Sequence, residues 1–408
     1  MRAFENYSTK WVDQMLENPS EDGAPARRLG MFGCLALYLP VAMFCIYCAD
    51  RGQISSPLNA TSLNAAPPTA LSAPAFLTQR ETRALWLWDE TPSSQAIIEN
   101  REGAQDALLD FLAAPHGAPK RNINRLFFAA QGHAPGDPLK AAQPVQYNPL
   151  VGEDARPHLQ RLLGRLSAQG VATELLAGQA IWLASDELAQ IPVQRCRETV
   201  AFNLASEDPK ARFAGVHLDI EPHTITRGPW AGQWWQHRLP RGYNAEWTQR
   251  WKEILTSCRQ ILDDYQAQTG QRLTLSSDIG SDFARYNQPM RKFLNRADGP
   301  LDYLVVLNYF DTRKNQRGQP MFVDGAHDGE QIVGGVRQNL ALWSQVPVLI
   351  GVETGPESIA PDPTSFYQEG YQIMHQTLDT LLVEQASARL IGVAIHHYAP
   401  DAYRDMKP

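Results

Sequence analysis

The chain has 408 residues and a formal net charge of −7 at pH 7, and 43% of its residues are hydrophobic. The acidic balance argues against a nucleic-acid partner, because phosphate backbones attract basic surfaces. The length exceeds the ~250 residues of a typical single α/β barrel, so we expect one large domain with additional segments.

Residues 29–49 contain no charged side chain, and a run of this length can span a bilayer as a helix. Arg27 and Arg28 precede the run, so the positive-inside rule keeps residues 1–28 in the cytoplasm as a leader. Pro40 lies within the run, which membrane helices tolerate. A cleaved signal peptide is the alternative, but the leader is long and no small-x-small cleavage site follows. We therefore expect a single-pass anchor in the inner (cell) membrane, with the C-terminal domain periplasmic or extracellular.

Residues 50–79 are rich in Ser, Pro, Ala, Asn and Thr, which predicts a flexible linker between the anchor and the folded domain. Beyond this linker only Cys196 and Cys258 remain, and they fall on consecutive predicted helices. A disulfide between them is possible in an oxidising compartment, but we expect two separate buried thiols. No Cys/His spacing typical of structural zinc is present.

Residues 80–408 alternate apolar strands with amphipathic helices and are expected to form one domain. The predicted strands lie at 83–88, 124–130, 171–177, 215–221, 272–278, 301–309, 346–353 and 390–397. The predicted helices lie at 94–113, 154–169, 186–205, 245–269, 288–296, 330–343 and 365–384. The last strand lies too close to the C-terminus for a full helix to follow it. This pattern predicts a (β/α)8 TIM barrel. A doubly wound open sheet would also alternate, but no GxGxxG follows the first strand.

The segment 213–222 is an apolar strand that ends in acidic residues. Because side chains two apart on a strand share a face, His217, Asp219 and Glu221 point to the same side. Two carboxylates on one face resist burial, so packing alone rarely selects them. Paired carboxylates at the end of a strand are typical of acid/base catalysis on a glycosidic bond. A rim of solvated acids is the alternative interpretation.

Polar and aromatic side chains gather at the ends of other predicted strands, where a barrel places its active site. We expect a shared substrate-binding role for Trp86, Trp88, His217, Asp278, Asn308, Asp311, Glu353, His397 and Tyr398. The long loop after the fourth strand adds Trp230 and Trp234, whose indole faces can stack on sugar rings. A cap that packs over the barrel mouth is the other interpretation of this loop.

Two short motifs carry a family resemblance. The stretch GVHLDIEP at 215–222 resembles the strand-four signature of glycoside hydrolase family 18, DGxDxDxE. The stretch VLNY at 306–309 resembles the strand-six M-x-Y motif of the same family. The resemblance follows the order of the barrel elements over residues 80–400. Ala214 and His217 stand where the signature has its two earlier aspartates.

The resemblance implies a catalytic role for three residues. Glu221 matches the general acid, and Asp219 matches the acid that orients and polarises the N-acetyl group of the substrate. Tyr309 matches the hydroxyl that supports the attacking acetamido oxygen. This mechanism uses the amide of the substrate as the nucleophile and needs no cofactor.

Three alternatives remain open. A retaining glycosidase would use Glu221 as the acid and Glu353 as the nucleophile, although Ile220 stands where that clan has Asn. A metal hydrolase, which we do not favour because the first strand lacks His-x-His, would bind its ion through His217, Asp219, Glu221, His396 and His397. A non-catalytic sugar-binding barrel could serve an envelope polysaccharide system. We predict a membrane-anchored glycoside hydrolase that acts on an extracytoplasmic polysaccharide or glycoconjugate and binds no metal.

Overall fold

The computed structural model describes residues 77, 81–88, 93–131, 147–225, 228–236, 242–281, 283–309, 330–360, 364–385 and 387–408. All of them belong to one compact unit. The predicted leader (1–28), the anchor (29–49) and all of the linker (50–79) except Leu77 lie outside the described residues, as does Asp311. No helix in the described part of the chain is long and apolar enough to cross a membrane.

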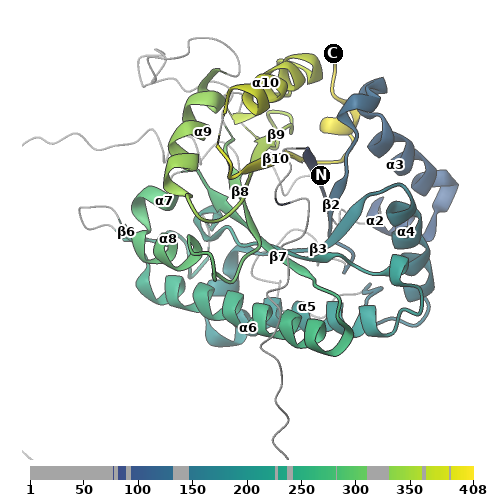
Figure 1. Ribbon diagram of the computed structural model, residues 1–408, viewed down its shortest axis with the longest axis horizontal. Coiled ribbons are helices and arrows are strands. Elements are labelled where there is room, and N and C mark those ends of the chain that lie inside the picture. The colour runs from purple at the N-terminus through teal and green to yellow at the C-terminus, as the bar shows by residue number, and fades with distance from the viewer. Residues whose placement is uncertain are drawn as a thin grey trace, which may run out of the picture. The chain divides into compact units, whose positions relative to one another are not determined.

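Eight parallel strands close into a barrel in the order β1-β10-β9-β8-β7-β4-β3-β2, with the helices around it (Figure 1). The strands are β1 (Thr82–Leu87), β2 (Arg125–Phe128), β3 (Ala172–Gly178), β4 (Gly215–Asp219), β7 (Thr274–Gly280), β8 (Tyr303–Leu307), β9 (Val348–Glu353) and β10 (Leu390–His396). The predicted (β/α)8 barrel is therefore confirmed, and the open doubly wound sheet is wrong because β1 pairs with both β2 and β10.

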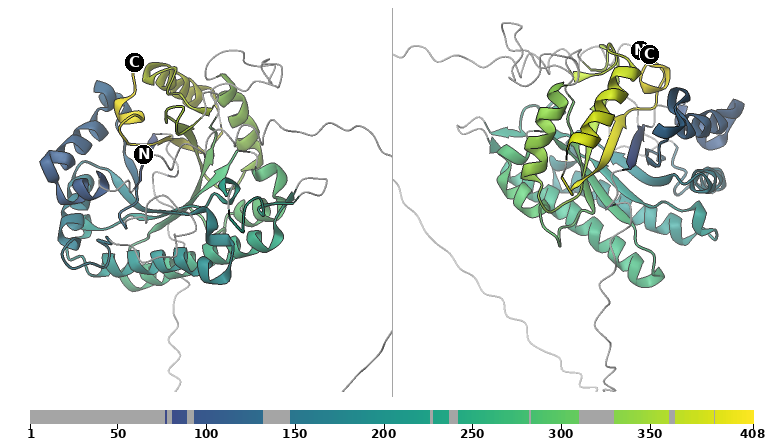
Figure 2. Two further views of the ribbon diagram at one scale, coloured as in Figure 1. Left: turned by 180° about the vertical axis from the view of Figure 1, so that it is seen from behind. Right: turned by 45° about the horizontal axis from the view of Figure 1, so that its top comes forward.

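The helices are α2 (Ser93–Glu99), α3 (Ala104–Ala113), α4 (Arg156–Ala168), α5 (Asp186–Leu204), α6 (Ala245–Thr269), α7 (Phe283–Tyr286), α8 (Gln288–Leu294), α9 (Glu330–Leu342) and α10 (Tyr371–Glu384). The views in Figure 2 show them packed around the outside of the strands. The predicted helix 94–113 is broken in two, because Asn100, Glu102 and Gly103 have positive φ values of 55°, 52° and 77°. As expected, β10 is followed only by a short 3-10 turn, Tyr403–Asp405.

Helices α5 and α6 flank β4 in sequence, and each begins with a side-chain cap. Ser185 accepts a hydrogen bond from the Leu188 amide at the start of α5, and Asn244 caps α6 in the same way. The prediction of two separate thiols is wrong, because Cys196 of α5 and Cys258 of α6 form a disulfide with a Cα–Cα distance of 5.6 Å. Their spacing along the chain did not reveal that these two helices pack side by side.

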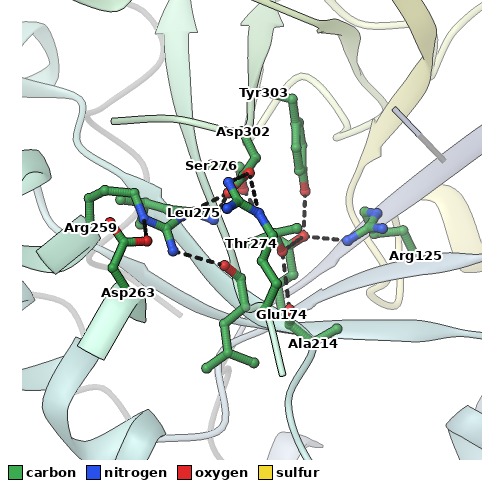
Figure 3. A network of polar contacts seen from close by, with 12 residues as sticks. Arg125, Glu174, Ala214, Arg259, Asp263, Thr274, Leu275, Ser276, Asp302 and Tyr303 are labelled. Atoms are coloured by element: carbon green, nitrogen blue, oxygen red, sulfur yellow. Dashed lines mark hydrogen bonds and ion pairs between the residues drawn. The ribbon is translucent and has the colours of Figure 1, made fainter. Parts of the chain in front are cut away.

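A buried ion pair forms the floor of the barrel interior. Arg125 of β2 pairs with Glu174 of β3, and both side chains are at most 5% exposed. Glu174 also accepts hydrogen bonds from Thr274 Oγ1, Ser276 Oγ and the Tyr303 hydroxyl, each at 2.7 Å. Figure 3 shows these donors converging on the Glu174 carboxylate from β2, β7 and β8. The buried Glu174 carboxylate is therefore compensated by one cation and three hydroxyl donors, as a buried charge requires.

Strand β4 lies very close to β7 at this level. A Cβ atom added at Gly215 would stand 2.0 Å from Thr274 Oγ1 and 2.3 Å from the Thr274 carbonyl oxygen. Only glycine fits there, so Gly215 permits the close approach that brings the next residues of β4 and β7 into contact. His217 is in register with Ser276, two residues further along both strands.

The loop after β4 contains a small hairpin that the sequence did not predict. Its strands are β5 (Trp235–Gln236) and β6 (Gly242–Tyr243), which pair antiparallel. Trp234 precedes the hairpin and is 2% exposed. Its ring lies 4.7 Å from that of Tyr243 and 5.9 Å from that of Trp251 on α6. The hairpin is thus fastened to α6 by aromatic packing.

Candidate active site

The acids of β4 lie at the carboxyl end of the barrel, as predicted. Alternation along the strand turns His217 and Asp219 toward the barrel interior, whereas Leu218 and Ile220 pack in the outer core between strands and helices. His217 is fully buried and Asp219 is half-buried. Glu221 lies two residues beyond the end of β4, and its side chain is 30% exposed. Exposure to solvent therefore increases from His217 through Asp219 to Glu221, from the barrel core to its open carboxyl end.

His217 bridges two residues of β7. Its Nδ1 lies 2.8 Å from Ser276 Oγ, and its Nε2 lies 2.9 Å from Asp278 Oδ2. The ring is stacked on Phe127, with centroids 3.8 Å apart and planes at 9°. Burial lowers the pKa of His217 to about 3, so the ring is neutral at physiological pH. The predicted substrate-binding role of His217 is replaced by a role beneath the acids, because the ring has no exposed surface.

Asp219 and Asp278 interact directly with each other. Burial raises the pKa of Asp219 well above its usual value, and the neighbouring Asp278 raises it further through charge and a hydrogen bond. Burial also raises the pKa of Asp278 well above its usual value, and the hydrogen bonds with Trp86 and Asp219 oppose this in part. Two carboxyl groups in contact cannot both ionise, so the pair retains at least one proton.

Glu221 has the environment of a carboxylic acid that holds its proton. Burial raises its pKa well above the usual value, and the charges of Asp219, Asp278 and Glu353 raise it further. Its Oε1 lies 3.6 Å from Nε2 of His223, whose pKa is lowered to about 4 by burial. A neutral His223 adds no positive charge that would ionise Glu221.

Glu353, at the end of β9, is held in the opposite state. Its Oε1 accepts hydrogen bonds from the backbone amides of Thr354 and Gly355 at 2.8 and 2.7 Å, and its Oε2 lies 2.9 Å from His396 Nδ1. Although burial acts to raise the pKa of Glu353, His396 and these amides lower it below the usual value. The site therefore contains one ionised carboxylate and, at Glu221, a carboxyl that stays protonated.

Tyr309 follows β8 and lies within electrostatic reach of all four acids. Burial raises the pKa of its hydroxyl well above 10, and Glu353, Asp278, Glu221 and Asp219 contribute in that order. The phenol therefore keeps its proton and can donate a hydrogen bond. The structure thus brings together Tyr309, after β8, and the four acids predicted at the ends of β4, β7 and β9.

Among the described residues, Glu353, His396 and His397 form the group whose ligand atoms lie close enough to share a metal ion, within 4.8 Å. The hydrogen bonding does not fit a metal. Trp88 Nε1 donates to His396 Nε2 at 2.9 Å, which places the His396 proton on Nδ1. That Nδ1 faces Glu353 Oε2 and lies 3.1 Å from His397 Nδ1. A protonated ring nitrogen cannot ligate a metal, so the three residues form a hydrogen-bonded group.

Several predicted binding residues are packed inside the protein. Trp86 is fully buried and meets Phe127 and His217 edge-on, so it belongs to the barrel core beneath the acids. Trp234 fastens the hairpin as described. The predicted substrate-binding roles of Trp86 and Trp234 do not fit these positions, because an indole that fills a core position cannot also stack on a sugar.

Other predicted residues surround the mouth less directly. Tyr398 is half-buried, and its ring lies 5.2 Å from that of Phe111 in the outer core. His397 and Asn308 are 3% and 2% exposed. Trp230 is half-buried and packs against the outer core.

Trp88 is half-buried beside His396, at a ring distance of 6.4 Å. Like Trp86, it packs in the barrel interior, because side chains two apart on a strand share a face.

The sequence analysis missed the residues that support the acids from below. Glu174 and Ser276 connect the barrel floor to His217, and Gly178 leaves space for Asp219. A Cβ at Gly178 would stand 2.7 Å from the Asp219 carbonyl oxygen and 2.8 Å from the Trp88 ring. Ser276 shares a strand face with Asp278, which was a usable signal. No signal in the sequence indicated the register that places it beside His217.

No family model and no curated protein matches the chain. Similar solved structures include a glycoside hydrolase family 18 N-acetylglucosaminidase from Paenibacillus barengoltzii, with 13% identity, 68% of this chain and 69% of that chain covered, and a TM-score of 0.38. ICChI chitinase from Ipomoea carnea is 13% identical over 79% and 96% of the chains, with a TM-score of 0.43. The catalytic domain of a psychrophilic chitinase B from Arthrobacter TAD20 is 12% identical over 81% and 94%, with a TM-score of 0.43. These similarities are low, and the barrel fold rests on the strand order described above.

Proposed function

We propose that the protein is a glycoside hydrolase that cleaves an extracytoplasmic polysaccharide or glycoconjugate. The observation that carries this proposal is the contrast between Glu221 and Glu353 at one barrel mouth. Burial and surrounding acids keep Glu221 protonated, whereas hydrogen bonds keep Glu353 ionised. Two carboxyl groups with pKa values pushed apart are the equipment for cleaving a glycosidic bond.

In the preferred mechanism, Glu221 donates its proton to the leaving glycosidic oxygen. Asp219 orients the N-acetyl group of the substrate, and the Tyr309 hydroxyl donates a hydrogen bond to the acetamido oxygen that attacks the sugar carbon. The partly exposed position of Glu221 and the buried positions beneath it suit these roles, because the acid must reach a substrate that enters from the mouth. General acid catalysis of this kind contributes typically ~10²–10⁴-fold to the rate.

A retaining mechanism with Glu353 as the nucleophile is the second candidate. The lowered pKa of Glu353 favours it, since a nucleophilic carboxylate must be ionised. Against it, Glu353 already accepts hydrogen bonds at both oxygens from Thr354, Gly355 and His396. The two mechanisms differ in substrate, because only the first requires an acetamido group next to the scissile bond.

Extracytoplasmic action is part of the proposal and has independent support. The Cys196–Cys258 disulfide is of a kind that persists in oxidising compartments and is rare in the cytosol. This agrees with the anchor predicted at residues 29–49, which would place the barrel outside the cytoplasm.

The test is product release by the purified chain on a panel of N-acetylated and neutral polysaccharides. Glu221→Gln should abolish release while folding and sugar binding persist, because the amide keeps the shape but has no proton to donate. Glu207→Gln, the same substitution at an exposed position, should behave as wild type. Dependence on the acetamido group would favour the first mechanism over the second. Binding by calorimetry without any cleavage would instead identify a sugar-binding barrel.

A further inference from the structure

A chain of hydrogen bonds leads from Asp219 down to the barrel floor. Ser276 has one O–H, which it donates to Glu174 Oε2 at 2.7 Å. Its oxygen is therefore the acceptor for His217 Nδ1–H at 2.8 Å. With the ring proton on Nδ1, the Nε2 of a neutral His217 is an acceptor. Its partner at 2.9 Å is Asp278 Oδ2, so the proton in that bond belongs to Asp278.

The upper end of the chain is the Asp219–Asp278 carboxyl contact. Asp219 Oδ1 and Asp278 Oδ1 are both buried, and the side chains that hydrogen-bond to Asp278 include the Trp86 indole N–H as well as Asp219. The hydrogen bond between the two carboxyl groups requires a proton on one of them, because two ionised carboxylates are both acceptors. All donors then point inward, from Asp219 through Asp278, His217 and Ser276 to the Glu174 carboxylate.

We propose that Asp278 and His217 relay a proton between Asp219 and the barrel interior during turnover. This inference rests on the proposed function and assigns two positioning residues that act through Asp219. As Glu221 protonates the leaving oxygen, Asp219 transfers its proton to Asp278 Oδ1, and Asp278 transfers its Oδ2 proton to His217 Nε2. Asp219 becomes an anion, Asp278 stays neutral, and His217 becomes an imidazolium, so charge and protons are conserved. The reverse transfer restores the resting state.

The interior is equipped to hold a transient positive charge on His217. Phe127 stacks face to face on the ring at 3.8 Å, and an aromatic face attracts a cation. Glu174 favours the charged form, whereas burial and Arg125 oppose it. The titratable or charged side chains around the ring come from every neighbouring strand: Arg125 (β2), Glu174 (β3), Asp219 (β4), Asp278 (β7) and Tyr303 (β8). In the resting state burial and Arg125 keep His217 neutral. The negative charge of an ionised Asp219 would favour the imidazolium form.

In this relay, Asp219 becomes negatively charged by passing its proton to the barrel interior. Asp219 could ionise beside the developing positive charge of the sugar without exchanging a proton with solvent. Because His217 holds the proton inside the barrel, the step does not depend on water entering a closed site. Hydrogen bonding alone would not let Asp219 ionise in this way. Variants that keep the hydrogen bonds but cannot take up a proton therefore separate positioning from proton transfer.

The experiment compares His217→Gln and Asp278→Asn with wild type, using His158→Gln on α4 as the matched control. Glutamine can accept the Asp278 hydrogen bond but cannot become a cation, and asparagine can donate to His217 but cannot pass a proton. We expect kcat to fall about tenfold or more with KM little changed, and the pH profile of kcat to shift. Wild-type kcat and pH profile in both variants would overturn the relay. Asp278→Asn is nearly isosteric and provides the result if His217→Gln does not fold.

A second measurement does not depend on activity. The ¹⁵N shifts of histidine, with His217 assigned by its loss in His217→Gln, report the tautomer in the full chain between pH 5 and 8. A neutral Nδ1–H form supports the resting chain, and either a neutral Nε2–H form or an imidazolium at rest overturns it. If wild type releases no product from any glycan, the proposed function and the turnover step both fail. A neutral His217 with its proton on Nδ1 would then still establish the hydrogen-bonded chain, so the two failures are distinguishable.

Discussion

Replacing Glu174 by Gln tests whether the barrel floor is held by a compensated charge. The Glu174 carboxylate is fully buried, pairs with Arg125, and accepts hydrogen bonds from Thr274, Ser276 and Tyr303. The amide nitrogen of Gln cannot accept from any of these donors, and the neutral side chain leaves the buried guanidinium without its counter-charge. Removing one partner of a buried ion pair costs about 3–5 kcal/mol.

The assay is the free energy of unfolding from denaturant titration, with thermal unfolding as a second readout. A loss of this size corresponds to a decrease in Tm of about 4–7 °C for a domain of roughly 330 residues. Glu246→Gln is the control, because Glu246 pairs with Arg250 at the surface and is 71% exposed. Surface pairs contribute roughly 0–1 kcal/mol, so the control should be close to wild type. A Glu174→Gln loss no larger than that of the control would refute the reasoning.

Three further predictions follow from the site and its supports. Gly178→Ala should impair activity more than stability, since its Cβ would stand 2.7 Å from the Asp219 carbonyl oxygen and displace that residue; kcat/KM and Tm measured together check this. Removing the Cys196–Cys258 disulfide with serines should cost about 2–5 kcal/mol in denaturant titrations, because the cross-link limits the unfolded chain, and unchanged stability would contradict it. Because its pKa is raised, Glu221 keeps its proton above pH 4.5, so kcat/KM should fall only as the pH rises through that raised pKa; a decline already complete near pH 4.5 would contradict the assignment.

Much of the scaffold could be predicted from the sequence by itself. Eight apolar runs alternate with seven amphipathic stretches, and each predicted strand is present within a few residues of its predicted bounds. Period-two alternation predicted that Asp219 and Glu221 share a face, and their position at a strand end of the barrel predicted that they lie near Asp278, Tyr309 and Glu353. These features are local, because a strand's faces and its end follow from the order of its own residues.

The protonation of the site was decided only by tertiary structure. His217 appeared to be a binding residue, yet register with β7 places it between Ser276 and Asp278 and buries it completely. Trp86 and Trp234 appeared available to a sugar, but both fill core positions. The Cys196–Cys258 bond depended on the packing of α5 against α6. The pKa values of the site, the burial of these rings and the disulfide all depend on which strands and helices lie next to each other. Residues far apart in the sequence jointly determine this arrangement.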